Sequence, residues 1–283
     1  METFEGRLAV VTGGGTGMGR ELVIQLATEG CSIAMCDVNK DNMGETALRA
    51  AAAAPEGVKV TTHLCDVSKE DEVLRFRDEV LAAHNTEHIN LLFNNAGVGG
   101  GGSFIEGERD EWERTFGIDW GAVYNCCRAF VPLLVKSDEG HLINTSSVNG
   151  FWASLGPGIP HTAYSAAKFA VKGFTEALLT DFRVNAPHVG VSVVMPGHIG
   201  TDIVINSRKV IRESDDEMSD DEIEQMRDNL AKRGMPVEGV STDFDLQTPA
   251  FEQADAHGYL LRIGRAGWRQ QSHTISRLES PRF

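Results

Sequence analysis

The sequence places a tyrosine and a lysine four positions apart, in the run YSAAK at 164–168, at the start of a predicted helix. Side chains at positions i and i+4 share one face of a helix, so the ammonium of Lys168 can approach the phenol of Tyr164. A tyrosine has an ordinary pKa of about 10, and a nearby ammonium stabilises the phenolate form. Such a pair could exchange a proton with an alcohol or a carbonyl group near neutral pH. Ser147, which follows an upstream predicted strand, could hydrogen-bond to the same substrate oxygen.

Taken alone, this spacing is a weak signal, because many amphipathic helices hold a packed tyrosine and a solvent-facing lysine. A glycine-rich run, TGGGTGMG at 12–19, adds weight, since it follows an apolar segment and opens a helical pattern. Gly13 allows a tight exit from the strand, Gly17 lets the backbone approach a pyrophosphate, and Gly19 lets the helix pack closely. The helix N-terminus offers unpaired N–H groups to phosphates. The predicted dinucleotide contacts in this run are Gly13, Thr16, Gly17, Met18 and Gly19.

Asp37 ends the second predicted strand, 20 positions after Gly17. A carboxylate there can accept hydrogen bonds from both hydroxyls of the adenosine ribose, and it would repel a 2′-phosphate. The first cation after Asp37 in the sequence is Lys40. We therefore predict NAD as the cofactor rather than NADP. The alternative, an aspartate that only caps a turn or a helix, stays open because aspartate favours such positions.

Two further groups stand where predicted strands end. Asp66 and Val67 follow the third strand, where an adenine ring should lie, and the run NNAG at 94–97 follows the fourth. An asparagine amide can tie neighbouring strands together, while Ala96 and Gly97 leave room for a ribose. Ligands of parallel sheets bind at the carboxyl ends of the strands, where all these groups stand. The predicted contacts are Asp66, Val67, Asn95, Ala96 and Gly97.

The elements that must position these residues alternate along the first 200 residues. Apolar runs at 8–12, 31–36, 58–65, 88–93, 140–145 and 191–195 are separated by helical patterns, the longest at 110–135 and 162–184. Alternation of strand and helix predicts βαβ units and a parallel sheet. Because the strand runs are apolar throughout, we expect helices on both faces of the sheet.

We predict a single dinucleotide-binding and catalytic domain over residues 1–283. The alternation stops after Gly197, and we expect residues 202–240 to form an insertion that acts as a substrate lid. The alternative for its acidic cluster at 213–224 is the solvated face of a surface helix, where acidic runs are common. Residues 249–283 form an atypical C-terminal segment without a convincing strand.

Composition excludes several classes of protein. The formal net charge of −15 disfavours binding to nucleic acids and to anionic membranes, because both attract clustered Lys and Arg. No apolar run approaches the roughly 20 residues that span a bilayer, and acids occupy the start where a secretion signal is basic. The 5 cysteines have no metal-ligand spacing, so we predict no metal site and a reduced, cytoplasmic chain.

Together, the motifs resemble those of the short-chain dehydrogenase/reductase family. The matching runs are TGGGTGMG (12–19), DV (66–67), NNAG (94–97), SSVNG (146–150), YSAAK (164–168) and PG (196–197) with Thr201 beyond it. The resemblance covers about residues 5–201. It implies a Rossmann-type, doubly wound parallel sheet of six to seven strands in the order 3-2-1-4-5-6.

The resemblance also implies roles for single residues. Tyr164 would be the catalytic acid/base, Lys168 would assist it and bind the nicotinamide ribose, and Ser147 would match the catalytic serine. The backbone at Ile199 and the hydroxyl of Thr201 would meet the nicotinamide carboxamide. The cofactor contacts implied in this way are Tyr164, Lys168, Pro196, Gly197, Ile199 and Thr201. Family members are commonly tetramers joined through the two long helices, so we expect a homotetramer or a dimer.

Three features depart from the family pattern. Asp119 stands where the family usually has an asparagine whose backbone helps to hold a water near the lysine; Asp119 could raise the pKa of Lys168. We therefore count Asp119 in the catalytic group and predict a slower or pH-shifted proton relay. Ser147 and Tyr164 are 17 positions apart, a longer loop than is common, and the C-terminal segment lacks the usual last strand.

The expected substrate is a neutral, hydrophobic secondary alcohol or ketone, because no arginine pair is evident to clamp an anion. The residues expected to line its site are Val98, Phe151, Trp152, Leu155 and Ile203. Apolar residues could equally fill the core or a subunit interface. The alternative function is a dinucleotide-binding regulator or scaffold with little turnover. A sugar-nucleotide epimerase also uses YxxxK, but such proteins usually show GxxGxxG and a larger C-terminal domain.

Overall fold

The structure, a computed structural model, describes residues 1, 3–153, 160–197 and 203–212, together with residues 224, 228 and 231. Three predicted site residues, Leu155, Ile199 and Thr201, lie outside the described residues. So do most of the predicted insertion at 202–240 and the whole segment at 249–283.

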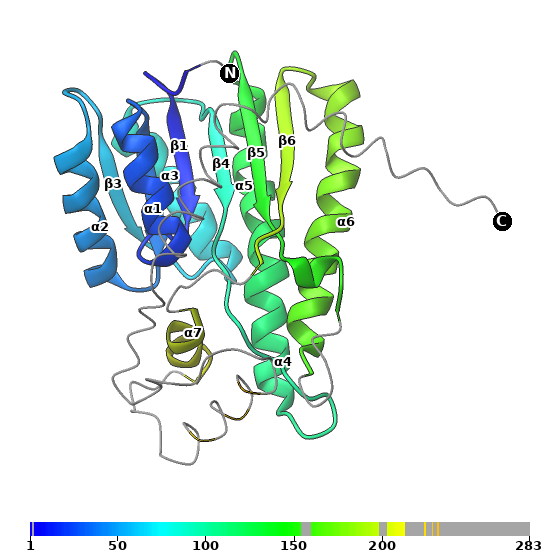
Figure 1. The fold of residues 1–283 in the computed structure, drawn as a ribbon. Helices are drawn as coiled ribbons and strands as arrows, with labels where there is room; N and C mark the ends of the chain where they lie inside the picture. Colours follow the sequence, from blue (N-terminus) through cyan, green and yellow to red (C-terminus); the bar gives the residue numbers. More distant parts are fainter. Residues whose placement is uncertain are drawn as a thin grey trace.

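Six parallel strands form one sheet, as predicted. They are β1 (Leu8–Thr12), β2 (Ser32–Asp37), β3 (Val60–Leu64), β4 (Leu91–Asn94), β5 (Gly140–Thr145) and β6 (Val189–Val194). Their order is β3-β2-β1-β4-β5-β6, with Val10 of β1 beside Ala34 of β2 and Leu92 of β4. The strand order reverses direction between β1 and β4, and the carboxyl ends of these strands lie at the same edge of the sheet (Figure 1). Sheets of this kind bind ligands at that edge, where the order reverses.

Helices cover both faces of the sheet, which confirms the expectation from the apolar strands. The helices α1 (Gly17–Thr28) and α2 (Lys40–Ala53) pack on one face, and α3 (Glu70–His84), α5 (Ala122–Val135) and α6 (Thr162–Asn185) pack on the other. Successive side chains of a strand enter opposite layers: Val10 joins the α3–α5 side and Val11 the α1 side, and both are fully buried. The two apolar layers hold the strand ends in place.

The long helix predicted at 110–135 is present, but it contains a turn of different geometry that the prediction missed. The helix α4 (Arg109–Phe116) leads into a π-helical turn, η1 (Gly117–Gly121), and only then into α5. A π turn carries an extra residue and is frequently found at functional sites. Asp119 lies in this turn and is fully buried. Periodicity did not reveal the turn because the residues around it also suit an ordinary α-helix.

Two short elements complete the carboxyl edge of the sheet: the 3₁₀ turn η2 (Val148–Gly150) after β5, and α7 (Ile203–Arg212). In Figure 1, α7 lies below the ends of β1 and β4. All five cysteines are free and buried. Among the described residues, none of the helices combines the length and apolar character that a membrane crossing requires.

Candidate active site

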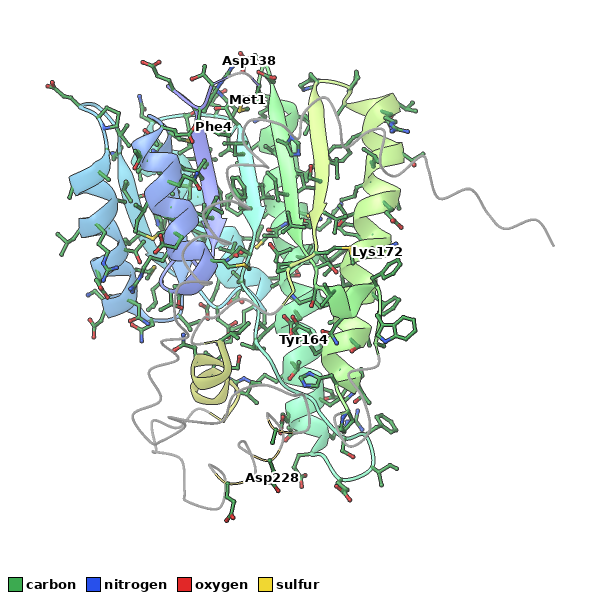
Figure 2. All side chains as sticks on the ribbon, in the orientation of Figure 1. Met1, Phe4, Asp138, Tyr164, Lys172 and Asp228 are labelled. Carbon is green, nitrogen blue, oxygen red and sulfur yellow. The ribbon has the colours of Figure 1, made fainter. Side chains whose placement is uncertain are left out.

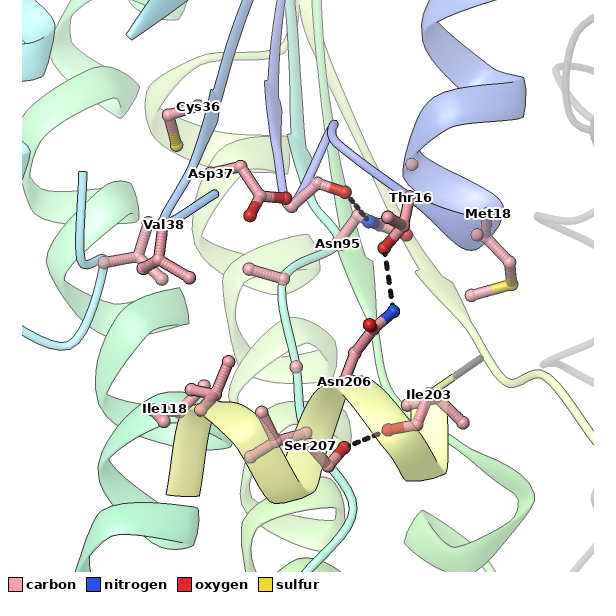
Figure 3. A pocket seen from close by; sticks show the side chains of 18 of the residues that line it. Thr16, Met18, Cys36, Asp37, Val38, Asn95, Ile118, Ile203, Asn206 and Ser207 are labelled. Atoms are coloured by element: carbon pink, nitrogen blue, oxygen red, sulfur yellow. Dashed lines mark hydrogen bonds between the residues drawn. The ribbon is translucent and has the colours of Figure 1, made fainter. Parts of the chain in front are cut away.

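A cleft of about 900 Å³, counted with its open mouth, lies at the carboxyl ends of β1 to β4. Its walls come from the glycine loop after β1, the residues that follow β2 and β3, the NNAG run, and α7 (Figure 3). The predicted site residues that line this cleft are Gly13, Thr16, Gly17, Met18, Gly19, Asp37, Asp66, Val67, Asn95, Ala96, Gly97, Val98 and Ile203. Residues far apart in the sequence thus meet at one site.

The glycine loop is shaped so that side chains do not fit at its two ends. Gly13 has a φ of +66°, and a Cβ there would lie 2.9 Å from Ala96 Cα. A Cβ on Gly19 would collide with the carbonyl oxygen of Gly13. The first turn of α1 carries no acidic residue, and the N-cap Thr16 makes no side-chain capping bond. The first N–H groups of the helix have no partner within it, so this end suits an anion such as a pyrophosphate.

Asp37 stands at the end of β2 with its carboxylate held by backbone groups. Its Oδ2 accepts a hydrogen bond from the Gly15 amide at 3.0 Å, and its Oδ1 accepts one from the Asn39 amide at 3.0 Å. The side chain lines the cleft beside Val38 (Figure 3). Each carboxylate oxygen can accept more than one hydrogen bond, which leaves capacity for ribose hydroxyls.

Thr12 and Asn95 hold the loop after β4 against the glycine loop, and Asn94 ties β4 to β5. Thr12 Oγ1 accepts hydrogen bonds from the amides of Asn95 and Ala96, each at 3.0 Å. Asn95 Nδ2 donates to the Thr12 carbonyl at 3.0 Å. On the neighbouring strand, Asn94 Nδ2 donates to Asn144 Oδ1 at 2.8 Å. The amide ties expected of the NNAG run are present, and they fix one wall of the cleft.

The lysine of the YSAAK run forms a buried ion pair. Lys168 Nζ lies 3.0 Å from Asp119 Oδ1, with the two side chains 4% and 0% exposed. Burial by itself lowers the pKa of Lys168, but the Asp119 carboxylate and the adjoining Tyr164 side chain outweigh it, and the pKa lies above its ordinary value. Burial raises the pKa of Asp119 and outweighs the opposing effect of Lys168. The ammonium also donates to the Thr145 carbonyl at 3.3 Å, so its position is fixed.

Tyr164 is half-buried near the start of α6, at the carboxyl edge of the sheet (Figure 2). The Lys168 ammonium lies 5.5 Å from the centre of its ring, and the His161 ring stands edge-on to it with centroids 5.9 Å apart. Tyr164, Lys168 and Ser147 do not themselves line the cleft. Gly97 connects the two regions, because it lines the cleft and a Cβ on it would lie 3.2 Å from Lys168 Nζ.

The two serines after β5 do different things. Ser147 caps η2, and its Oγ accepts a hydrogen bond from the Asn149 amide at 3.1 Å. Ser146 Oγ donates to the Lys168 carbonyl at 2.7 Å. A Cβ on Gly150 would lie 2.6 Å from that same carbonyl, so a glycine lets η2 pack against α6. Ser146 therefore holds α6 in place at Lys168, a positioning role that the sequence did not reveal.

The residues expected to contact the substrate fall into two groups. Val98 and Ile203 line the cleft, whereas Phe151 and Trp152 are 62% and 68% exposed and do not line it. Pro196 and Gly197, which follow β6, are also outside its lining.

Further residues of the cleft were missed by sequence reasoning. They are Cys36, Val38, Cys65, Ile118, Asn206, Ser207 and Val210. Two of the missed residues flank Asp37 and one precedes Asp66, so chain proximity could have found them. The α7 residues belong to no motif. The only sequence feature that links them is a spacing that puts them on one face of a helix.

The family model for short chain dehydrogenases matches residues 7–211, and the chain belongs to this family. It is 38% identical over 207 residues to the oxidoreductase SadH of Mycobacterium tuberculosis, which covers 73% of this chain and 72% of that protein. It is 33% identical over 199 residues to the 3-oxoacyl-[acyl-carrier-protein] reductase FabG of Chlamydia trachomatis, which covers 70% of this chain and 75% of that protein.

Solved structures agree with this assignment. A short-chain dehydrogenase/reductase from Burkholderia phymatum in complex with NAD superposes with a TM-score of 0.65 and 30% identity, covering 95% of this chain and 82% of that one. A metagenomic short-chain oxidoreductase in complex with NADP gives a TM-score of 0.60 and 31% identity, covering 69% of this chain and 84% of that one. The chain is thus similar to proteins crystallised with either nicotinamide dinucleotide.

Proposed function

We propose that the chain is an NAD(H)-dependent alcohol dehydrogenase or carbonyl reductase. The observation that carries this proposal is the buried ion pair of Asp119 and Lys168 beside the Tyr164 ring. This group adjoins, through Gly97, a cleft whose glycine loop suits a pyrophosphate. An acid/base next to a dinucleotide cleft is what transfer of a hydride and a proton requires.

The cleft fits a nicotinamide dinucleotide, because its cradle excludes side chains at Gly13 and Gly19 and leaves the first N–H groups of α1 unpaired. When bound, the cofactor supplies the hydride acceptor or donor. The residues proposed to hold it are Gly13, Thr16, Gly17, Met18, Gly19, Asp37, Asp66, Val67, Asn95, Ala96, Gly97, Tyr164, Lys168, Pro196, Gly197, Ile199 and Thr201.

In the proposed mechanism, the Tyr164 oxygen takes the hydroxyl proton of an alcohol during oxidation and returns a proton to the carbonyl oxygen during reduction. The Lys168 ammonium favours the phenolate by its charge. Ser147 hydrogen-bonds to the same substrate oxygen and orients it. Asp119 holds the ammonium in place and compensates part of its charge.

The proposed substrate is a hydrophobic secondary alcohol or its ketone. None of the residues proposed to contact the substrate is a lysine or an arginine, so an anionic substrate would find no cationic clamp among them. Val98 and Ile203 give the cleft an apolar part. The proposal also includes Phe151, Trp152 and Leu155, which follow Ser147 closely in the chain.

We also propose that the chain forms a homo-oligomer through α5 and α6, as a tetramer or a dimer. These helices expose large apolar side chains to solvent, which favours burial against another copy. The exposed residues are Tyr124, Val135, Phe169 and Val184. A cytoplasmic location is proposed because the five free, buried thiols suit a reducing compartment.

The second candidate is a dinucleotide-binding regulator or scaffold with little turnover. The observation that favours it is the carboxylate of Asp119, since a compensated ammonium promotes the phenolate less strongly than a lone one. Tight NADH binding without oxidation of any alcohol would select this alternative.

The proposed function is tested by a dehydrogenation screen in which NAD and NADP are offered side by side with secondary alcohols. We expect NADH to form with apolar alcohols and NADPH to form far more slowly, because the Asp37 carboxylate repels the 2′-phosphate. The substitution Asp37→Ser should reduce this preference about 10- to 100-fold, mainly by improving kcat/KM with NADP. Asp41→Ser, which removes a carboxylate from the first turn of α2, should leave it unchanged. A wild-type preference for NADP would refute the role of Asp37.

The substitution Asp119→Asn is expected to move the alkaline limb of the pH–rate profile to lower pH. In this variant burial lowers the pKa of Lys168 without the opposing effect of the Asp119 carboxylate, so the ammonium is lost at lower pH. The measurement is kcat/KM for oxidation against pH in both proteins. An unchanged profile, or one moved to higher pH, would contradict the role given to Asp119.

A further inference from the structure

The helix α7 turns one face into the cleft. Ile203, Asn206, Ser207 and Val210 all line it, at the i, i+3, i+4 and i+7 spacing of a single helix face. From Ile203 to Val210 the helix rises about 10 Å, at 1.5 Å per residue. The face is apolar at both ends and polar in the middle, which matches a molecule with two ring systems and a polar centre.

The direction of α7 agrees with this match. Figure 3 shows the helix running across the cleft, with Ile203 on the side of Met18 and its other end towards Ile118 and Val38. Val38 follows Asp37, which marks the adenosine end in the proposed function. The polar middle of α7 therefore faces the glycine loop, where the pyrophosphate is expected to bind.

Asn206 reaches that loop directly. Its Nδ2 donates a hydrogen bond to Thr16 Oγ1 at 3.3 Å, although the two residues are 190 positions apart (Figure 3). Thr16 is the N-cap of α1, so the amide lies beside the unpaired N–H groups of the first helical turn. An amide carries two N–H donors, and only one is needed for Thr16.

Ser207 holds α7 in this position. Its side chain is 2% exposed, and its Oγ accepts a hydrogen bond from the Gly99 amide at 2.7 Å while donating to the Ile203 carbonyl. A Cβ on Gly100 would collide with the side chain of Ile211, so the glycines after β4 allow α7 to approach closely. The helix is thus tied to the loop after β4 as well as to the glycine loop.

We propose that Asn206 is a cofactor-binding residue whose amide donates a hydrogen bond to the pyrophosphate of the bound dinucleotide. This inference rests on the proposed dinucleotide function. The pyrophosphate would then bind between two sets of donors, the N-terminus of α1 on one side and Asn206 on the other. Ser207 is a positioning residue that keeps the amide within reach.

The test is a fluorescence titration of the full chain with NADH. We expect Asn206→Ala to raise the Kd for NADH about tenfold, because hydrogen bonds to charged groups are among the stronger ones. Asn206→Asp should raise it more, by about 100-fold at low salt, because its carboxylate opposes the pyrophosphate. Added salt should shrink the effect of the aspartate. Asn185→Ala, an exposed asparagine at the far end of α6, is the matched control and should bind NADH like the wild type.

Displacement of NADH by fragments separates direct contact from loss of local structure. Asn206→Ala should raise the inhibition constant of ADP-ribose by the same factor as the Kd of NADH, and should leave that of adenosine, which has no phosphate, unchanged. Equal weakening of both fragments would overturn the pyrophosphate contact. Wild-type affinity in both Asn206 variants would overturn the inference alone. A wild-type chain that binds no NADH would overturn the proposed function together with it.

Discussion

Replacement of Tyr164 by phenylalanine is expected to lower kcat for alcohol oxidation by about 10²- to 10⁴-fold, the usual contribution of a general acid or base. The phenol is half-buried and stands 5.5 Å, measured to its ring centre, from the Lys168 ammonium. Phenylalanine keeps the ring and its contact with His161 but removes the oxygen that is proposed to carry the proton. The measurement is the initial rate of NADH formation at saturating alcohol and NAD.

Binding should be largely preserved in this variant, because Tyr164 is one of many residues proposed to hold the cofactor and phenylalanine keeps its ring. We expect the Kd for NADH to change less than about threefold. The matched control is Tyr124→Phe, which removes the same atom from an exposed tyrosine of α5 and should leave kcat unchanged. If Tyr164→Phe oxidised alcohols as fast as the wild type, the enzyme assignment would fail and only the fold would stand.

The substitution Asp119→Ala is expected to lower the free energy of unfolding by about 3–5 kcal/mol, the usual cost of leaving one member of a buried ion pair without its partner. The Lys168 ammonium would stay buried without a counter-charge, although it keeps its hydrogen bond to the Thr145 carbonyl. The Val98 amide, which donates to Asp119 Oδ1 at 3.2 Å, would lose its acceptor as well. The measurement is urea-induced unfolding, in which the midpoint should fall while the slope is unchanged.

A double variant separates the charge from the packing. Asp119→Ala combined with Lys168→Met leaves no buried charge, so it should be more stable than Asp119→Ala alone, although inactive. Asp119→Asn should be less destabilised than Asp119→Ala, because an amide can still accept from Val98 and fills the same volume. A double variant that is less stable than Asp119→Ala alone would show that the buried charges are not the source of the loss.

The carboxylate at position 119 also bears on what kind of protein this is. In the structure it compensates the ammonium that should promote the phenolate, while fixing that ammonium in place. Asp119 therefore weakens the effect of the Lys168 charge on the phenol, but it fixes the ammonium in place. The activity of Asp119→Asn relative to the wild type shows which of these two effects is larger. That result bears directly on whether the protein is an enzyme or a regulator.

Much of the fold could be predicted because it is encoded locally. Apolar runs such as 8–12 and 140–145, bounded by turn residues, predict buried parallel strands wherever helical patterns separate them. The strand order came from the resemblance, and the structure has the same order. Gly13 and Gly19 could be singled out because their places in a strand–turn–helix unit exclude a side chain.

Much of the cleft was predictable for a related reason. The end of each strand is visible in the sequence, and parallel strands bring their carboxyl ends to one edge. Asp37, Asp66 and the NNAG run therefore had to lie near the glycine loop, and they line the same cleft. The catalytic group was harder, since the YxxxK spacing alone is too common to identify a site.

The sequence alone thus determined the sheet, its covering helices and the edge at which a ligand binds, because strand ends and glycine turns depend on neighbours in the chain. The resemblance brought Asp119 near Lys168, but only the tertiary structure decided their direct ion pair, the π-helical turn at 117–121 that carries Asp119, and the approach of Asn206 to Thr16. The ion pair and the Asn206–Thr16 contact each join residues that are far apart in the sequence. Such contacts depend on how packed helices are positioned against one another, and no local sequence pattern specifies that geometry.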